Sequence, residues 1–530
     1  MRCPVSNLLH DRLIRVRMKD GTAESLTLPG VYAALQTDRV ADFPSLRPHQ
    51  RHAWHAFLAQ LAVIALDRTG SRSFPATSVA WEAALRALTP QYAADEPWTL
   101  IVEDPTLPAF MQCPAPNGLE EYRKLVETPD DLDLLVSSKN HDVKQTVALN
   151  SAPEDWLFAL VDLQTMAGVL GRGNYGIARM NGGFSSRPCL GLAPARVGIG
   201  GHVFHDVERM LADREELLER YSSYFRPQGG TALVWLEPWD GAESLDLRSL
   251  DPYFVEVCRR VRLYTERGVI AALAAASRKS RIDARAARGD LGDFWTPTVV
   301  KESKALSISS RGFTYKRLTE LLFERTHKCP PAMKVGDRPG HWTLVARGVA
   351  GGQGKTQGYH QRTDIVLSPQ IARSLFRQQE RDRLAELGRI QMEEVAAVSG
   401  ALGLGIATAA SGGKAPEDVG RGHRAQATPF VLRLDAVADA RFFAALESRY
   451  LAADEGERNA CRDDFAKDLI AAARTLLREA IESVPCPAVR RHRARAKALS
   501  AFERKLRRPR GVLADVFRTS EGEHGRTSQT

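Results

Sequence analysis

The sequence predicts an α+β protein with three parts: a large irregular mixed N-terminal domain (residues 1–365), a C-terminal four-helix bundle (residues 366–513) and a disordered tail (residues 514–530). Two observations support this division. Up to about residue 365, short strand-like and helix-like runs alternate between glycines and prolines. After Pro369, amphipathic segments of helical period follow one another with few helix breakers. A chain of 530 residues also exceeds a typical single domain.

The first 365 residues contain both kinds of element. Leu13–Met18 alternates like a strand and ends in the turn signal Lys19-Asp20-Gly21. Arg51–Asp67 has helical spacing with a broad apolar face, and Trp156–Leu170 is a second helix by the same criterion. Ala232–Leu236 and Trp342–Val345 are short β-like runs. We therefore expect a mixed domain with long loops.

The bundle is predicted from a series of amphipathic stripes. Ile371–Gly400 is the first helix, and the small residues of Ala401–Gln426 continue it as far as Gly412-Gly413. The remaining helices are expected over Asp435–Leu451, Glu455–Val484 and Pro487–Arg508. Asp435 and Pro487 are residue types that favour helix starts.

The composition is that of a globular protein with a moderate basic excess. The chain is 44% hydrophobic and 26% charged, with a formal net charge of +9. The start of the sequence has no apolar targeting segment, and the strongest apolar runs, near Phe57–Leu66 and Val269–Ala276, are about half the ~20 residues of a membrane span. Seven scattered cysteines form no CxxC pair. These features predict a cytoplasmic protein that is not associated with a membrane.

The segment Gly351–Gly358 imitates a nucleotide-binding loop. Gly354-Lys355-Thr356 supplies the second half of a P-loop, but the first glycine should stand at Val349. The residues after the lysine also make a poor helix start. We therefore expect a mobile, glycine-rich loop whose polar side chains suit backbone phosphates and base edges: Gln353, Lys355, Thr356 and Gln357.

Other candidate chemistry is weaker. Gly171–Gly176 matches G-x-G-x-x-G, but a helix-like segment precedes it, so we expect Gly171–Gly183 to be a loop whose backbone approaches a neighbour closely. His202 and His205 could share a helical face, yet no third ligand stands at a recognisable spacing. No catalytic constellation emerges. The sequence predicts neither a catalytic residue, nor a metal ion, nor a cofactor.

Two basic clusters point to a polyanion. The last helix carries Arg490, Arg491, Arg493, Arg495 and Lys497, almost without acidic residues. A second concentration extends over Arg259–Arg288, and we expect the two clusters to line a channel for a nucleic-acid backbone. Its members are Arg259, Arg260, Arg262, Arg267, Arg278, Lys279, Arg281, Arg285 and Arg288.

Short motifs also resemble a known family. Asn7–Asp11, Leu46–Gln50 before the first long helix and Phe110–Gln112 resemble the large subunit of type I-E Cascade, the CasA family, in their order and spacing. Cascade is the CRISPR RNA-guided surveillance complex. The resemblance implies a non-catalytic subunit that recognises the protospacer-adjacent motif (PAM) of target double-stranded DNA through the minor groove and starts duplex unwinding.

The resemblance also implies partners. They are the crRNA-containing Cascade subunits, namely the backbone, the small subunit and the subunit that binds the 5′ handle, and the helicase-nuclease that the large subunit helps to recruit. Some members of the family carry cysteine pairs suited to zinc, and this chain has none.

The resemblance implies a set of DNA-contacting residues. Gln357 resembles the glutamine wedge inserted beneath the PAM, with Thr356 as its polar neighbour and Gln353 as a rival wedge. Asn181-Gly182-Gly183 resembles the glycine loop that faces the PAM. Ser137–Lys144, which contains Lys139, Asn140 and His141, corresponds to a loop that approaches the PAM region. The minor-groove cation corresponds to Arg285 or Arg288.

Two other functions remain open from the residues alone. One is a P-loop-like ATPase that uses Lys355 and Thr356. The other is a structural scaffold with basic loops that binds DNA without PAM preference.

Overall fold

The computed structural model describes residues 6–133, 135, 151–336, 338–352, 355–508 and 511–516, with only the backbone of Lys355. The chain divides into two compact units. The first unit consists of Met1–Phe313 and Arg325–Arg373. The second consists of Thr314–Glu324 and Ser374–Thr530, so a short segment from within the expected N-terminal domain is part of the C-terminal unit.

The first unit mixes helices with small sheets. Its helices are α1 (Leu28–Gln36), α2 (Arg51–Thr69), α3 (Ser78–Arg86), α5 (Pro153–Met166), α6 (Ile199–Arg220) and α8 (Pro369–Ser374). Its strands are β1 (Ile14–Met18), β2 (Ala23–Leu26), β3 (Val40–Asp42), β4 (Lys124–Val126), β5 (Cys189–Pro194), β6 (Thr231–Leu233), β7 (Leu245–Asp246), β8 (Leu250–Val255), β9 (Arg260–Glu266), β10 (Val269–Ala275), β11 (Ile282–Asp283), β12 (Thr298–Val299), β13 (Lys304–Ala305), β14 (His327–Lys328), β15 (Trp342–Gly352), β16 (Lys355–Arg362) and β17 (Val366–Leu367).

Helix α2 forms the centre of the first unit. It is apolar around most of its circumference, so nearly the whole helix is buried rather than one stripe. Trp54 stacks on Phe57 and meets Phe158 of α5 edge-on, which fixes α5 against it. The helix stops at Gly70, whose left-handed φ of 64° suits a glycine C-cap. The helix predicted over Arg51–Asp67 is confirmed, and the one predicted over Trp156–Leu170 is confirmed as far as Met166, where α5 ends.

A long hairpin dominates one sheet of this unit. Strand β15 pairs with β5 along one edge, and with β17 and then β16 along the other. The β-like run predicted at Trp342–Val345 is therefore only the start of an 11-residue strand. The strand predicted at Ala232–Leu236 is half wrong, because Val234–Leu236 forms a 3₁₀ turn.

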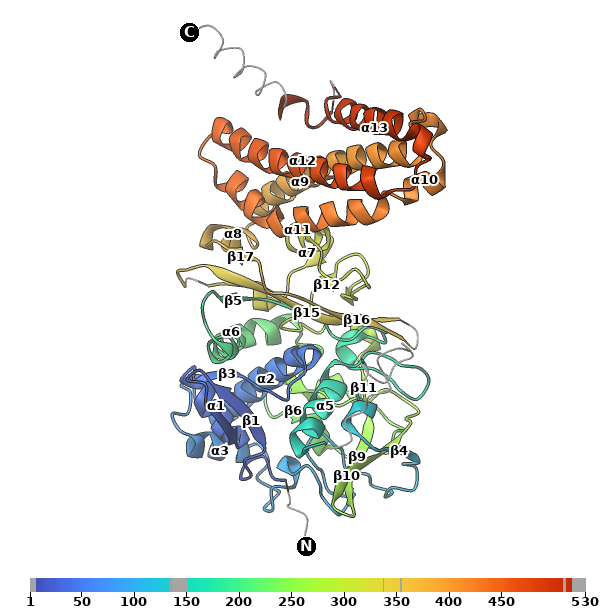
Figure 1. The fold of residues 1–530 in the computed structure, drawn as a ribbon. Coiled ribbons are helices and arrows are strands. Elements are labelled where there is room, and N and C mark those ends of the chain that lie inside the picture. Colours follow the sequence, from blue (N-terminus) through green and yellow to red (C-terminus); the bar gives the residue numbers. More distant parts are fainter. Residues whose placement is uncertain are drawn as a thin grey trace. The chain divides into compact units, whose positions relative to one another are not determined.

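The second unit is a helical bundle, visible in orange and red in Figure 1. Its long helices are α9 (Gln378–Ala410), α11 (Thr428–Leu451), α12 (Glu455–Ser483) and α13 (Arg491–Leu506), accompanied by the short helices α7 (Tyr315–Phe323) and α10 (Arg421–Ala425). Leucine, alanine and phenylalanine side chains fill its core. The predicted α+β fold class with C-terminal helices is confirmed.

Three details of the bundle differ from the sequence expectation. The helix predicted over Ile371–Gly400 is divided, because α8 ends at Ser374 and α9 begins at Gln378. Asp435 does not start a helix, since α11 begins seven residues earlier at Thr428. Instead its carboxylate accepts a 2.9 Å hydrogen bond from Tyr315 Oη of α7. Helix α9 is long and apolar enough to cross a membrane, although the sequence predicts no run of that length, and 56% of its apolar 18-residue window is buried inside the protein.

Candidate nucleic-acid interface

The segment expected to be a loop is the end of the β15–β16 hairpin. Gly351 lies opposite Thr356 and Gly352 opposite Lys355. The expectation of a mobile loop over Gly351–Gly358 is therefore wrong for all of it except Gln353 and Gly354, which lie outside the described residues. Lys355 and Thr356 start a strand and not a helix, so the backbone amides do not form a P-loop.

Gln357 lies at an irregularity in this hairpin. Val349 pairs with Tyr359 but Gly351 pairs with Thr356, so Gln357 and Gly358 together oppose the single residue Ala350. Such a β-bulge changes the direction in which a side chain projects. Gly358 has a φ of 105°, which a larger residue would rarely adopt, and Gln357 is exposed. The bulge thus presents one amide side chain to solvent from a paired strand.

The Thr356 side chain, unlike that of Gln357, points into the protein. Only 7% of its surface is exposed, and its hydroxyl lies 3.5 Å from the carbonyl oxygen of Leu135. It borders a small cavity of about 30 Å³ together with His49, Asp162, Phe184 and Gly352. Burial and the neighbouring charge of Asp133 raise the pKa of Asp162 to about 7. Thr356 therefore anchors the hairpin end, and Gln357 is the exposed member of the pair.

The turn Asn181–Gly183 follows a 3₁₀ turn over Ala178–Met180. Asn181 and Gly182 have left-handed φ values of 46° and 76°, and both are exposed. The buried Arg179 fixes this turn from below through ion pairs of 3.0 Å to Glu256 and 3.2 Å to Asp293. Breaking a buried pair of this kind removes about 3–5 kcal/mol of stability, so the turn is rigidly supported.

The residues after the turn contact the hairpin. The amide of Ser186 donates a 3.3 Å hydrogen bond to the carbonyl of Val349. A Cβ on Gly351 would overlap the carbonyl oxygen of Phe184. Likewise, a Cβ on Gly168 would stand 2.8 Å from the carbonyl carbon of Phe184. The expected close approach within Gly171–Gly183 is confirmed at two glycines: a Cβ on Gly173 would stand 2.8 Å from Cβ of Ala276, and one on Gly176 would stand 2.6 Å from the carbonyl carbon of Gly168.

A basic depression borders the same turn. It has a volume of about 360 Å³, and its lining includes Asn181, Gly182, Arg278, Lys279 and Arg285. The Arg285 side chain is 86% exposed and pairs with Asp283 at 3.2 Å. The structure therefore brings Arg285 together with Asn181 and Gly182. Arg288 is exposed with a left-handed φ of 51°, and is not among the residues that line the depression.

Part of the basic cluster over Arg259–Arg288 does not face solvent, so the predicted channel lining is wrong for those members. Arg259, Arg260, Arg262 and Arg281 are buried. Arg262 donates to the carbonyls of Leu107 and Val102 at 2.9 and 3.0 Å. These arginines satisfy buried backbone acceptors, whereas Arg267, Arg278, Lys279, Arg285 and Arg288 are exposed.

The basic face of the second unit is fully exposed. Arg490 lies in the 3₁₀ turn before α13, and Arg491, Arg493, Arg495 and Lys497 lie on α13 itself. Arg495 pairs with Glu482 at 3.4 Å. Within the described part of the chain, the other four have no ion pair, so their charge is available to a polyanion.

The loop with Lys139, Asn140 and His141 lies outside the described residues, as does the rival wedge Gln353.

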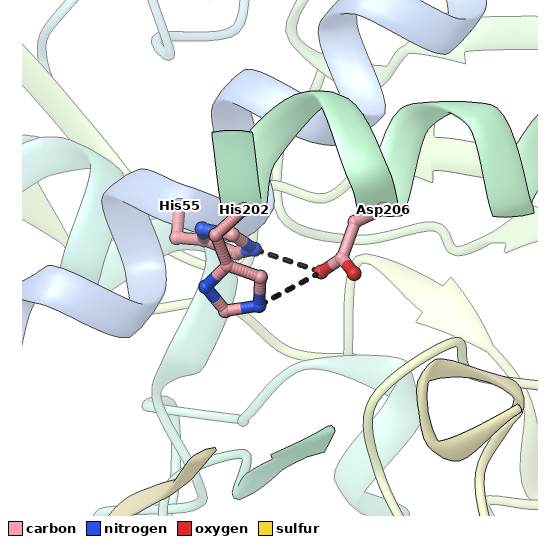
Figure 2. A group of neighbouring side chains, drawn as sticks. All are labelled: His55, His202 and Asp206. Carbon is pink, nitrogen blue, oxygen red and sulfur yellow. Dashed lines mark hydrogen bonds and ion pairs between the residues drawn. The ribbon is translucent and has the colours of Figure 1, made fainter. Parts of the chain in front are cut away.

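One cluster of two histidines and an aspartate is not apparent from the sequence. His202 and Asp206 lie on α6, as Figure 2 shows, and His55 of α2 joins them, with its Nε2 2.8 Å from Asp206 Oδ2. The third residue is 151 positions from Asp206, so no local spacing could reveal it. His205, the expected companion of His202, instead packs against Trp342 with ring centroids 5.2 Å apart.

The fold was compared with known proteins. No family model and no curated protein matches the sequence. Among solved structures, CRISPR-associated protein Cse1 from Acidimicrobium ferrooxidans is 15% identical with a TM-score of 0.62, covering 96% of this chain and 98% of that one. Thermobifida fusca Cse1 is 15% identical with a TM-score of 0.60, covering 94% and 98%. CasA from Thermus thermophilus is 15% identical with a TM-score of 0.57, covering 96% and 99%.

These likenesses define the class. The fold of this chain, an irregular α+β unit with a C-terminal helical bundle, is similar to that of the CRISPR-associated Cse1 proteins. The name CasA is used for the same protein as Cse1 in Thermus thermophilus. The chain has this fold over nearly its whole length. The fold that the short N-terminal motifs implied is confirmed.

Proposed function

We propose that this chain is the non-catalytic large subunit of a type I-E Cascade, acting in the cytoplasm on target double-stranded DNA. One observation carries the proposal. The segment Asn181–Ser186 contacts the Gln357 hairpin on one side and borders the basic depression with Arg285 on the other. Three features suited to DNA are thereby joined within a single rigid unit.

Each feature has a physical role in PAM recognition. The minor groove distinguishes base pairs poorly, so recognition there depends on groove width and close backbone approach. The exposed backbone of Asn181 and Gly182 permits that approach, and Arg285 supplies a cation between the phosphate strands. Gln357, projected from the bulge, is the wedge.

The wedge acts at the nucleation of strand separation. Unstacking one base step requires a few kcal/mol. Because guide pairing roughly balances the lost DNA pairing, a small protein contribution at the first step decides whether the R-loop forms. A planar amide at Gln357 can stack in the opened step and hydrogen-bond the exposed base edges. No covalent bond is made or broken in this mechanism, so it requires no catalytic group.

The proposed partners are the crRNA-bearing Cascade subunits and the helicase-nuclease. The experiment is competition between duplexes that differ only in the PAM, with the chain assembled into Cascade. We expect the PAM duplex to win by at least tenfold. Equal competition would favour the structural scaffold, and failure of the chain to assemble with the other subunits would refute membership of Cascade.

A further inference from the structure

The cluster of His55, His202 and Asp206 lies inside the first unit and contains none of the residues assigned to DNA. One ligand atom from each of the three side chains lies within 4.8 Å of the other two. His202 Nε2 is 3.7 Å from Asp206 Oδ2, and the two imidazole centroids are 4.2 Å apart. We propose that these three side chains form a binding site for one divalent transition-metal ion, Zn²⁺ being the best fit.

The distances suit zinc. Zn²⁺ binds imidazole nitrogen and carboxylate oxygen at about 2.0–2.1 Å in tetrahedral geometry, which places ligand atoms about 3.3 Å apart. The two nitrogen–oxygen separations of 2.8 and 3.7 Å lie on either side of that value. Two imidazoles and one carboxylate favour zinc over calcium or magnesium, which require mostly oxygen ligands. Water completes the fourth position.

The surroundings hold the carboxylate in place. Trp295 Nε1 donates a 2.7 Å hydrogen bond to Asp206 Oδ2, which is the kind of outer contact that orients a metal ligand. The ligands come from two long helices, α2 and α6, so their backbone positions are rigid. The side chains of His55 and His202 keep 12% and 14% exposure, which leaves an ion a way in. A bound ion would tie α2 to α6.

A second group of this kind is less suited. His49, Asp133 and Asp162 also converge, but Asp133 already bonds His49 at 2.5 Å and Arg47 at 3.3 Å. Both contacts are to Oδ2, so the positive charge of an arginine already lies at the oxygen that would bind the ion. At the cluster of His55, His202 and Asp206, the positive charge that would repel a bound cation is that of Arg347 on β15. This charge disfavours a positive charge on both His55 and His202. Arg347 must weaken cation binding there, and this gives the proposal a specific test.

The test is Zn²⁺ titration of the full chain without a histidine tag, by calorimetry against a competing chelator. We expect one Zn²⁺ per chain, with affinity reduced at least tenfold by His202→Gln or His55→Gln. His205→Gln is the matched control, because it removes a buried imidazole from the same helix without removing a ligand, and it should leave affinity unchanged. Arg347→Gln should tighten binding.

Three outcomes would overturn the proposal. They are the absence of stoichiometric binding, an equal loss in the His202 and His205 variants, and weaker binding in Arg347→Gln. Circular dichroism without metal checks that each variant is folded. If neither ligand variant folds, X-ray absorption of the zinc-loaded wild type decides. Two imidazole ligands with oxygen support the site, and sulfur ligands or a single imidazole exclude it.

Discussion

Gly351 of the hairpin lies against the backbone of Phe184, and the two residues leave no room for a side-chain carbon between them. A Cβ built on Gly351 would overlap the Phe184 carbonyl oxygen and stand 2.9 Å from Cα of Ser185. This contact joins the hairpin that carries Gln357 to the segment that follows the turn at Asn181. The relative position of Gln357 and the turn therefore depends on this close contact together with the hydrogen bond from Ser186 to Val349.

Gly351→Ala should separate the hairpin from the turn. Since the overlapping atoms are backbone atoms, relief requires a main-chain shift, and we expect a loss of about 1–3 kcal/mol in unfolding free energy. Gly352→Ala is the matched control, because the nearest atom to its new Cβ is the flexible Gln357 amide at 3.6 Å. Urea unfolding compares the two. Equal stability would mean that the contact is not tight in solution.

Gln357→Ala should slow R-loop formation by about tenfold or more on PAM-bearing duplex, because loss of stacking in the opened step raises the barrier by about 1.4 kcal/mol or more. Assembly of the complex should be unaffected, since Gln357 is exposed. Gln361→Ala, an exposed glutamine of the same strand, is the control. Stopped-flow fluorescence on a strand-separation reporter gives the rate. A wild-type rate would exclude Gln357 as the wedge.

Neutralising the basic face of α13 should weaken DNA binding and reduce its salt dependence. For Arg490, Arg491 and Arg493 changed together to Gln, we expect the slope of log K against log salt to fall by about 0.9 for each phosphate that the variant no longer neutralises. Filter binding across a salt series measures this slope.

The control for the basic face is a triple change of the same charge elsewhere in the second unit. Arg377, Arg389 and Arg433 are exposed arginines, each already paired with a glutamate. Their replacement by Gln should leave the slope nearly unchanged. If both triple variants reduce the salt slope equally, the basic face of α13 does not contact DNA directly and affects binding only through the net charge of the protein.

Asp162 should make the first unit less stable as pH rises. Its pKa is raised from 3.8 to about 7 by burial and by Asp133, so between these values the folded protein binds more protons than the unfolded chain. The unfolding free energy therefore falls as pH increases through that window.

Asp162→Asn should remove this dependence. The variant should be more stable than wild type at pH 8, by up to about 4 kcal/mol, because one pKa unit corresponds to 1.36 kcal/mol. At pH 4 the two should be nearly equal. Glu219→Gln, which alters an exposed carboxylate of α6, should not change the pH profile. Parallel pH profiles for wild type and the Asp162 variant would show that this carboxyl does not titrate abnormally.

ATP should not bind to the hairpin. Lys355 and Thr356 begin β16, so no helix N-terminus follows them to hold a phosphate. Calorimetry with Mg-ATP should show no heat of binding, and Lys355→Ala should change nothing. Tight binding that depends on Lys355 would revive the ATPase alternative.

The sequence by itself determined the elements whose signal is local. The periodic stripes of α9 and α12, the broad apolar face of α2 and the alternation of β1 are each visible within one short stretch of sequence, because the spacing of apolar residues along a helix or strand is a local pattern. The exposed charges of α13 also followed from sequence, since a helix with so few apolar residues has only a narrow buried face.

The tertiary structure decided what depends on distant partners. Arg260 and Arg262 look like surface charge in sequence, yet they share one buried face of β9 because carbonyls remote in the chain accept their hydrogen bonds. Likewise, the bulge at Gln357 depends on the register with β15, and the cluster at Asp206 depends on α2 packing against α6. Burial and register are set by what comes to lie opposite a residue, and a single stretch of sequence does not contain that information.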